Sequence, residues 1–219
     1  MKLTLIRNQL SSKPIIPIAF FSLLTLAQPV AAHHPFGGTT PSNFWEGFSS
    51  GLGHPIVGLD HFAFIVASGL LGTKFKQGFL IPVAFIIATM AGTVIHLQEI
   101  NLPQPELIIA GSVVLFGGLL IIKNYQFFAS YFSTIIVATL AMIGGIFHGY
   151  AYGEAIVGAE MTPLFAYLVG FGVIQLLISF AAFLLGNMIL QRFKNRADFI
   201  LQIVGAGIST LGFFFLGGA

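Results

Sequence analysis

A short segment near the start of the chain combines the residue types of a cation site with two helix-disrupting residues. The segment reads His54-Pro55-Ile56-Val57-Gly58-Leu59-Asp60-His61. Neutral imidazole and carboxylate groups suit divalent Zn, Ni, Co or Fe. In one continuous helix, His61 would follow His54 by nearly two turns, on the same face and roughly 10 Å further along the axis. Because Pro55 suits the first turn of a helix, we expect His54 to be a cap-like residue near the membrane surface.

Asp60 is the most unusual residue of this segment, because its neighbours in sequence are apolar. A carboxylate at the centre of a membrane-spanning helix costs about 2.5–3.5 kcal/mol on insertion scales. Asp60 therefore needs a proton, a cation or an inward-facing cavity. The alternative is that Asp60 only orients His61 or forms a hydrogen bond to another helix.

Two further apolar stretches end in histidine and glutamate. His96 follows Gly92 by one turn and precedes Glu99, and His148 precedes Glu154 in a segment rich in glycine. The small residues allow a neighbouring backbone to approach each imidazole closely. For either histidine alone, a hydrogen bond between helices is the alternative to metal binding. Together with the first segment, they predict a divalent-cation site built from several helices.

The composition indicates that these histidine and acidic side chains belong to a membrane protein. Of 219 residues, 56% are hydrophobic and only 7% are charged, whereas soluble domains carry about 25% charged residues. This excludes a soluble enzyme, a disordered protein and a nucleic-acid binder. The nine Lys and Arg residues are spread along the chain, so they form no phosphate-binding patch. The chain has no cysteine, which excludes disulfides and thiolate metal sites, and its main partner is the lipid bilayer.

Six apolar stretches separated by short connectors predict an all-α membrane protein. Each stretch is long enough to cross about 30 Å of hydrocarbon, and none alternates as the strands of a membrane barrel would. We expect a six-helix transmembrane bundle formed by a single domain, residues 33–219. The expected spans are Gly47–Gly72, Gln77–Gln98, Pro105–Ile122, Phe128–Gly149, Met161–Leu190 and Asp198–Leu216.

The first 32 residues have the pattern of a cleavable signal peptide. A basic start that includes Lys2 and Arg7 precedes an apolar stretch, Ile15–Leu26, and small residues end at Ala32. The apolar stretch is short for a span, which needs about 20 residues. We therefore expect cleavage after Ala32 and a mature chain that begins outside the cytoplasm, the alternative being an uncleaved anchor helix.

The basic residues occupy alternate connectors. They are absent from the second and fourth connectors, and the positive-inside rule places the other three in the cytoplasm. Both ends of the mature chain then face outward, in an inner-membrane protein whose histidines all lie on or near the external side. There, the flexible His33-His34 pair could also bind metal. The basic connector residues are Lys74, Lys76, Lys123, Arg192, Lys194 and Arg196.

Two motifs resemble a known family. The pattern His54-Pro55-x-x-Gly58-x-Asp60-His61 is similar to a signature of the HupE/UreJ family, and His148-Gly149-x-Ala151-x-Gly153-Glu154 is similar to its second characteristic region. The resemblance covers essentially the whole chain. It implies an accessory function for hydrogenase or urease, secondary transport of nickel or cobalt, and metalloenzyme maturation proteins as partners. It also implies that His54, Asp60 and His61 are central and that His148 and Glu154 contribute.

We therefore expect a permease that imports Ni(II) or Co(II), with no catalytic residues and no permanently bound cofactor. The chain contains no P-loop pattern for nucleotide hydrolysis. One alternative is an intramembrane zinc hydrolase, for which Ser68 lies one helical repeat after His61; another is an accessory protein that binds metal without moving it. Metal accumulation separates the permease from both alternatives. The expected metal site comprises His54, Asp60, His61, His96, His148 and Glu154.

Overall fold

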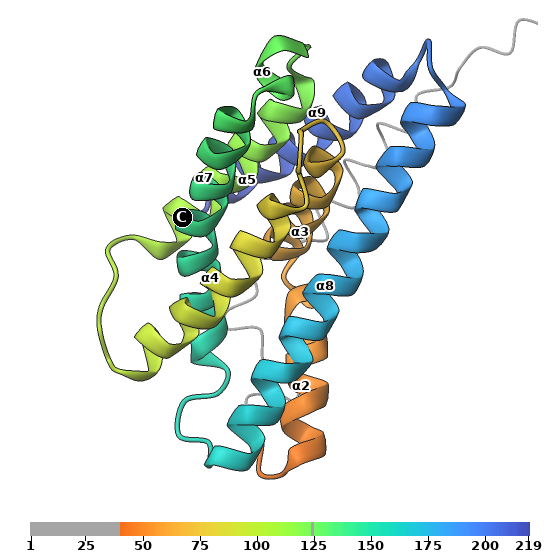
Figure 1. Ribbon diagram of the computed structural model, residues 1–219. Helices are drawn as coiled ribbons and strands as arrows, with labels where there is room; N and C mark the ends of the chain where they lie inside the picture. The colour runs from red at the N-terminus through yellow and green to blue at the C-terminus, as the bar shows by residue number, and fades with distance from the viewer. Residues whose placement is uncertain (1–39, 124) are drawn as a thin grey trace, which may run out of the picture. The chain divides into compact units, whose positions relative to one another are not determined.

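The computed structural model describes residues 40–123 and 125–219, and all regular elements in these ranges are helices (Figure 1). The expected all-α class is confirmed for this part of the chain. The expected signal peptide, residues 1–32, and the His33-His34 pair lie outside the described residues. The helices are α2 (Phe44–Val57), α3 (Leu59–Gly72), α4 (Leu80–Leu97), α5 (Pro105–Ile121), α6 (Tyr125–Ala129), α7 (Tyr131–Glu154), α8 (Met161–Arg192) and α9 (Ala197–Leu216).

Most of these helices have the length and composition of membrane spans. Among the described residues, α4, α7, α8 and α9 are each long and apolar enough to cross a bilayer, and the bent pair α2 and α3 counts as a fifth span when taken together. Helix α5 is apolar but shorter, at 17 residues. Large apolar side chains such as Phe132 and Phe180 are exposed on the outer faces, as expected where lipid is the solvent. The expected multi-pass membrane protein is therefore confirmed, with four to five candidate spans among the described residues. The expected number of six stays a prediction, because α5, at the place of the third expected span, is shorter.

The first expected span is not one continuous helix. It breaks at Gly58, and its two halves, α2 and α3, lie at 79° to each other. Pro55 lies in the last turn of α2 and not in the first turn of a helix, so the expected cap-like position of His54 is wrong. Because proline has no backbone N–H, the carbonyl of Gly51 loses its usual helical partner there. Helix α2 then ends within a turn, with the Gly58 N–H donating to the carbonyl of His54 at 3.1 Å.

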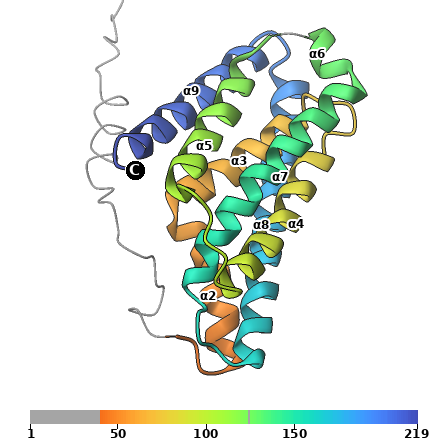
Figure 2. The same ribbon diagram turned by 90° about the vertical axis from the view of Figure 1, so that its left-hand side faces the viewer.

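The spans pack mainly as three pairs, which are α2 and α3 against α8, α4 against α7, and α5 against α9 (Figures 1 and 2). Glycines allow the close approach. A Cβ on Gly149 of α7 would collide with the backbone of Thr89 in α4, and one on Gly117 of α5 would collide with the backbone of Gly205 in α9. Small residues at helix interfaces are the usual solution in lipid, where van der Waals contact replaces the hydrophobic effect.

The connectors that follow α3 and α5 meet at one end of the helices. The Lys74 ammonium donates to the carbonyls of Leu120 and Ile122, at 3.1 and 2.6 Å. It also lies 4.1 Å from the centre of the Phe128 ring. Burial lowers the pKa of Lys74 to about 8, and the Asp198 carboxylate near the start of α9 opposes this shift. Three connectors with basic residues therefore share one end, and Lys74 satisfies carbonyls that the end of α5 leaves without helical partners.

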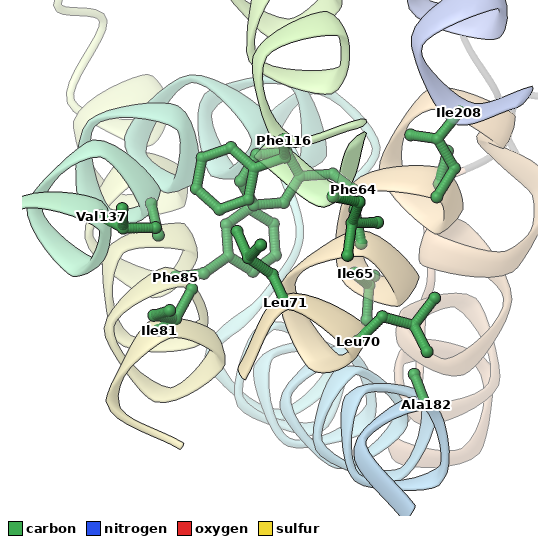
Figure 3. Close-up of a cluster of buried hydrophobic side chains, with 14 of the residues drawn as sticks. Phe64, Ile65, Leu70, Leu71, Ile81, Phe85, Phe116, Val137, Ala182 and Ile208 are labelled. Carbon is green, nitrogen blue, oxygen red and sulfur yellow. The ribbon is translucent and has the colours of Figure 1, made fainter. Parts of the chain in front are cut away.

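Three phenylalanine rings occupy the middle of the packed helices. Phe64 of α3 lies between Phe85 of α4 and Phe116 of α5, with ring centres 4.5 and 4.4 Å apart (Figure 3). All three side chains are fully buried. The rings join three spans and form the apolar layer on which the polar site rests.

Candidate functional site

Three buried histidines from two spans meet at the break in the first span. His54 lies in the last turn of α2, His61 in the first turn of α3, and His148 in α7. The 79° bend brings the His54 and His61 rings to 6.0 Å between centres. Nδ1 of His61 lies 2.6 Å from Nδ1 of His148. The expected stacking of His54 and His61 along one helix face is therefore wrong, because these residues belong to separate helices that fold toward each other.

Ser112 of α5 orients His148. The Ser112 hydroxyl donates to the carbonyl of Ile109 at 2.6 Å, and its oxygen lies 3.0 Å from Nε2 of His148. Since the hydroxyl proton is already used, the oxygen accepts the proton of His148 Nε2. Neutral His148 then has its lone pair on Nδ1, toward His61. A hydroxyl on a neighbouring helix thus determines which imidazole nitrogen faces the cluster.

Tyr167 of α8 plays the same part for His54. Its hydroxyl donates to the carbonyl of Tyr152 at 2.8 Å and lies 3.0 Å from Nδ1 of His54. The tyrosine oxygen therefore accepts from His54 Nδ1, which places the lone pair of the neutral imidazole on Nε2. Both histidines are oriented by hydroxyl groups whose own protons are directed to backbone carbonyls.

Asp60 lies at the edge of the cluster. Its Oδ1 accepts a hydrogen bond from the backbone N–H of His61 at 2.8 Å and lies 3.9 Å from Nδ1 of His61. Asp60 occupies the first turn of α3 and is partly exposed. The start of a helix favours a negative charge, so the carboxylate has a stabilising position as well as a place beside the imidazole. Because the hydrogen bond is to the backbone of His61, it does not itself fix the orientation of the imidazole.

The ring of Tyr152 completes the cluster. Its centre lies 5.0 Å from that of His54 and 4.5 Å from that of His61. The sequence did not indicate the parts played by Ser112, Tyr152 and Tyr167, because hydroxyl residues are common in spans as links between helices. The available signal for Tyr152 was its spacing of one helical turn from His148.

Two of the expected site residues lie apart from this cluster. His96 packs against the Tyr150 ring, with centres 4.5 Å apart, and against Gly153. Tyr150 is two residues from His148 and so lies on another face of α7. Glu154 is exposed at the last residue of α7. In the ranges that the structure describes, no three His, Asp or Glu side chains are close enough together to hold a metal ion.

The spacing of the two closest imidazoles is that of a hydrogen bond. At 2.6 Å, the Nδ1 atoms of His61 and His148 are too close to bind one ion together. Two nitrogens that each lie about 2.0–2.1 Å from a tetrahedral ion are about 3.3 Å apart. Converting this contact into a pair of metal ligands would therefore need a shift of less than about 1 Å and the removal of the proton that the two Nδ1 atoms share, for example by its transfer to Nε2 of His61.

The serine on which the hydrolase alternative depends is bonded within its own helix. The Ser68 hydroxyl donates to the carbonyl of Ile65 at 2.8 Å and is fully buried. This bond is a common one for serine inside a helix. It gives no support to Ser68 as a nucleophile.

The bundle and its site define a class of multi-pass membrane protein with a buried imidazole cluster at a broken helix. Residues 21–215 match the family model described as HupE / UreJ protein. The chain therefore belongs to the HupE/UreJ family, a family of accessory membrane proteins linked to hydrogenase and urease and not a known enzyme family. The expected membership is confirmed.

A curated relative agrees with the family assignment. The chain is 27% identical over 193 residues to Protein HupE from Rhizobium leguminosarum bv. viciae. The matched region covers 87% of this chain and 93% of the relative. No solved structure matches the chain.

Proposed function

We propose that this protein imports Ni(II) or Co(II) across the inner membrane. The observation that carries the proposal is the meeting of three buried imidazoles, from His54, His61 and His148, at a break in a membrane span. Imidazole nitrogens suit these borderline ions. Broken helices near a substrate site are typical of secondary transporters, where the ends of half-helices and irregular backbone face the ion. Membership in a family linked to two metalloenzymes agrees with such a cargo.

The ion would enter from the end opposite the basic connectors. Asp60 is partly exposed and lies beside His61, so its carboxylate is a first contact for a cation that approaches the cluster. The positive-inside rule assigns the end with the basic connectors to the cytoplasm. The mature N- and C-termini would then both lie outside.

The way from the site to the cytoplasm is closed by aromatic rings. The Phe64 ring lies 4.9 Å and the Phe85 ring 5.4 Å from that of His148, and both side chains are fully buried with Phe116 (Figure 3). An ion could pass this layer only if the rings separate. Transport would therefore alternate between the closed arrangement described here and one in which the helices that carry the rings have moved apart.

The membrane potential can supply the driving force. A divalent cation that moves inward through about 100 mV gains about 4.6 kcal/mol, twice the value for a single charge. This energy corresponds to a concentration ratio of more than about a thousand. Import therefore needs no nucleotide hydrolysis.

Uptake of radioactive nickel or cobalt into liposomes that contain the purified protein and carry an inside-negative potential tests the proposal. We expect the wild type to accumulate metal, His61→Ala to abolish accumulation, and Asp60→Asn to reduce it strongly. His96→Ala is the matched control, because this histidine lies outside the cluster, and it should retain most of the uptake. Competition between the two metals in the same assay shows which one is preferred. Normal uptake by well-incorporated His61→Ala protein, or none by the wild type, would contradict the proposal.

A further inference from the structure

Tyr152 carries a buried hydroxyl group without a hydrogen-bond partner. Its side chain is 0% exposed, and its oxygen is one of two buried side-chain atoms that lack a partner in residues 40–123 and 125–219. The other is Nδ1 of His96, outside the cluster. A phenol hydroxyl can donate and accept, and leaving it unpaired away from water is unfavourable. Such a group in a folded protein requires an explanation.

The ring that carries this hydroxyl is held inside the histidine cluster. It packs against the rings of His54 and His61, and its own backbone carbonyl accepts the hydroxyl of Tyr167. Tyr152 follows His148 by one turn of α7, so their side chains share a helix face. The ring that carries the unpaired oxygen is therefore part of the site that we propose for the cation.

Tyr167 shows that a tyrosine hydroxyl in this cluster can be fully satisfied. It is as deeply buried as Tyr152, yet its hydroxyl has two partners, the carbonyl of Tyr152 and Nδ1 of His54. The two tyrosines thus differ in hydrogen bonding although both lie in the cluster. The Tyr167 hydroxyl forms a hydrogen bond with His54 and so orients that histidine. The Tyr152 hydroxyl can also form hydrogen bonds, but it forms none in this structure.

On the basis of the proposed metal import, we infer that the Tyr152 hydroxyl accepts a hydrogen bond from a water molecule that the bound cation retains. A nickel or cobalt ion bound by imidazoles of this cluster would keep water in the coordination positions that protein ligands do not fill. Water bound to a divalent cation is a much stronger hydrogen-bond donor than bulk water, because the ion withdraws electron density from it. Tyr152 is then a specificity-determining residue. Its hydrogen bond raises the affinity of the site for a cation that keeps a bound water molecule, relative to a cation that loses all its water.

The test compares Tyr152→Phe with the matched control Tyr167→Phe in full-length protein purified in detergent without a polyhistidine tag. Thermal unfolding is followed without metal and during titration with NiCl2 or CoCl2, with MgCl2 as the control for ionic strength. Without metal, we expect Tyr152→Phe to unfold at the same temperature as the wild type or higher, because it loses only an unsatisfied group. Tyr167→Phe should unfold at a lower temperature, because its loss leaves a carbonyl and an imidazole without their partner.

With metal, the nickel or cobalt concentration that gives half of the stabilisation should rise about ten- to hundredfold in Tyr152→Phe, as expected for the loss of one hydrogen bond to a charged partner. An unchanged half-maximal concentration would overturn the inference and leave metal binding itself intact. A drop in metal-free stability as large as that of Tyr167→Phe would also overturn it, because the hydroxyl would then have a partner at rest. Absence of stabilisation by either metal in the wild type would instead refute the proposed function, and the role of Tyr152 with it.

Discussion

At the scale of single residues, the site is determined by hydroxyl groups as much as by histidines. Ser112 and Tyr167 each direct their own proton to a backbone carbonyl and present an oxygen to an imidazole, that of His148 or of His54. Because the carbonyls belong to rigid helices, the ring orientations and the tautomers of the neutral imidazoles follow from the backbone. Such outer partners commonly affect metal affinity by about 10- to 100-fold.

Ser112→Ala removes the partner of His148 and leaves its Nε2–H group buried without an acceptor. We expect the free energy of unfolding to fall by about 1–3 kcal/mol and the nickel affinity to fall about tenfold or more. Chemical denaturation and nickel titration of the purified protein measure the two effects. Ser68→Ala is the control, because the Ser68 hydroxyl bonds only a carbonyl of its own helix. If both variants bound nickel equally well, the orienting role of Ser112 would be wrong.

At the scale of elements, the break between α2 and α3 creates the site. The carbonyls at the end of α2 carry the negative end of that helix dipole to the position of His54, where a cation is favoured. The start of α3 carries the positive end of its dipole to Asp60, where it stabilises the carboxylate. In a continuous helix, His54 and His61 would lie apart along the axis. The carbonyls that end α2 and the N–H groups that begin α3 would then be bonded to each other within the helix.

Gly58→Ala tests the geometry of the break. The backbone angles of Gly58, φ −72° and ψ 100°, are accessible to alanine, so the change adds no backbone strain. The added Cβ would, however, lie 2.5 Å from Cδ2 of His61, and the imidazole would have to move. We expect the nickel affinity to fall about 10- to 100-fold, comparable to the loss of an orienting partner.

Gly118→Ala is the matched control for this prediction, since a Cβ at Gly118 of α5 would meet no atom within 4 Å. It should stabilise the protein by about 0.5–1 kcal/mol, as alanine does inside a helix, and should bind nickel normally. Nickel titration and thermal unfolding of both variants provide the comparison. Wild-type affinity in Gly58→Ala would show that the close contact with His61 has no role in the site.

At the scale of the whole molecule, the packing of the described spans follows an internal pattern. The bent pair α2 and α3 packs on α8, α4 packs on α7, and α5 packs on α9. This set of pairs stays the same when α2–α3, α4 and α5 are exchanged, in order, with α7, α8 and α9. A pairing of this kind is what two structurally similar halves would give. Gly58-x-x-His61 and Gly145-x-x-His148 share one spacing, and their imidazoles meet.

The proposed orientation in the membrane predicts the behaviour of reporter fusions. A reporter that is active only in the cytoplasm should be active when it is fused after Lys123 or Arg196, and inactive when it is fused near Glu160. A reporter that requires export should show the reverse. Measuring both activities in the same cells, normalised to the amount of fusion protein, checks the prediction. Cytoplasmic activity at Glu160 would place the connector between α7 and α8 inside and would remove the argument for external entry.

The sequence by itself determined the class of protein and most of the groups that can do chemistry. The low content of charge and the length of the apolar stretches are properties of local segments, so they predict helices in a membrane without knowledge of their partners. His54, Asp60, His61 and His148 could be selected because ionisable side chains are costly in lipid and are kept there for a reason. The two motifs also identified the family, which the family match confirms.

Only the tertiary structure decided which of these groups meet. His96 and His148 look equivalent in sequence, yet one packs against Tyr150 and the other contacts His61. Which faces of two helices come together depends on close packing between segments far apart in the chain, as at Gly149. The sequence pattern of one helix does not show which other helix packs against it. The hydroxyl partners could not be predicted for the same reason. The break at Gly58 could not be predicted either, because a proline in a span can begin a helix or end it, and the surrounding helices select between the two.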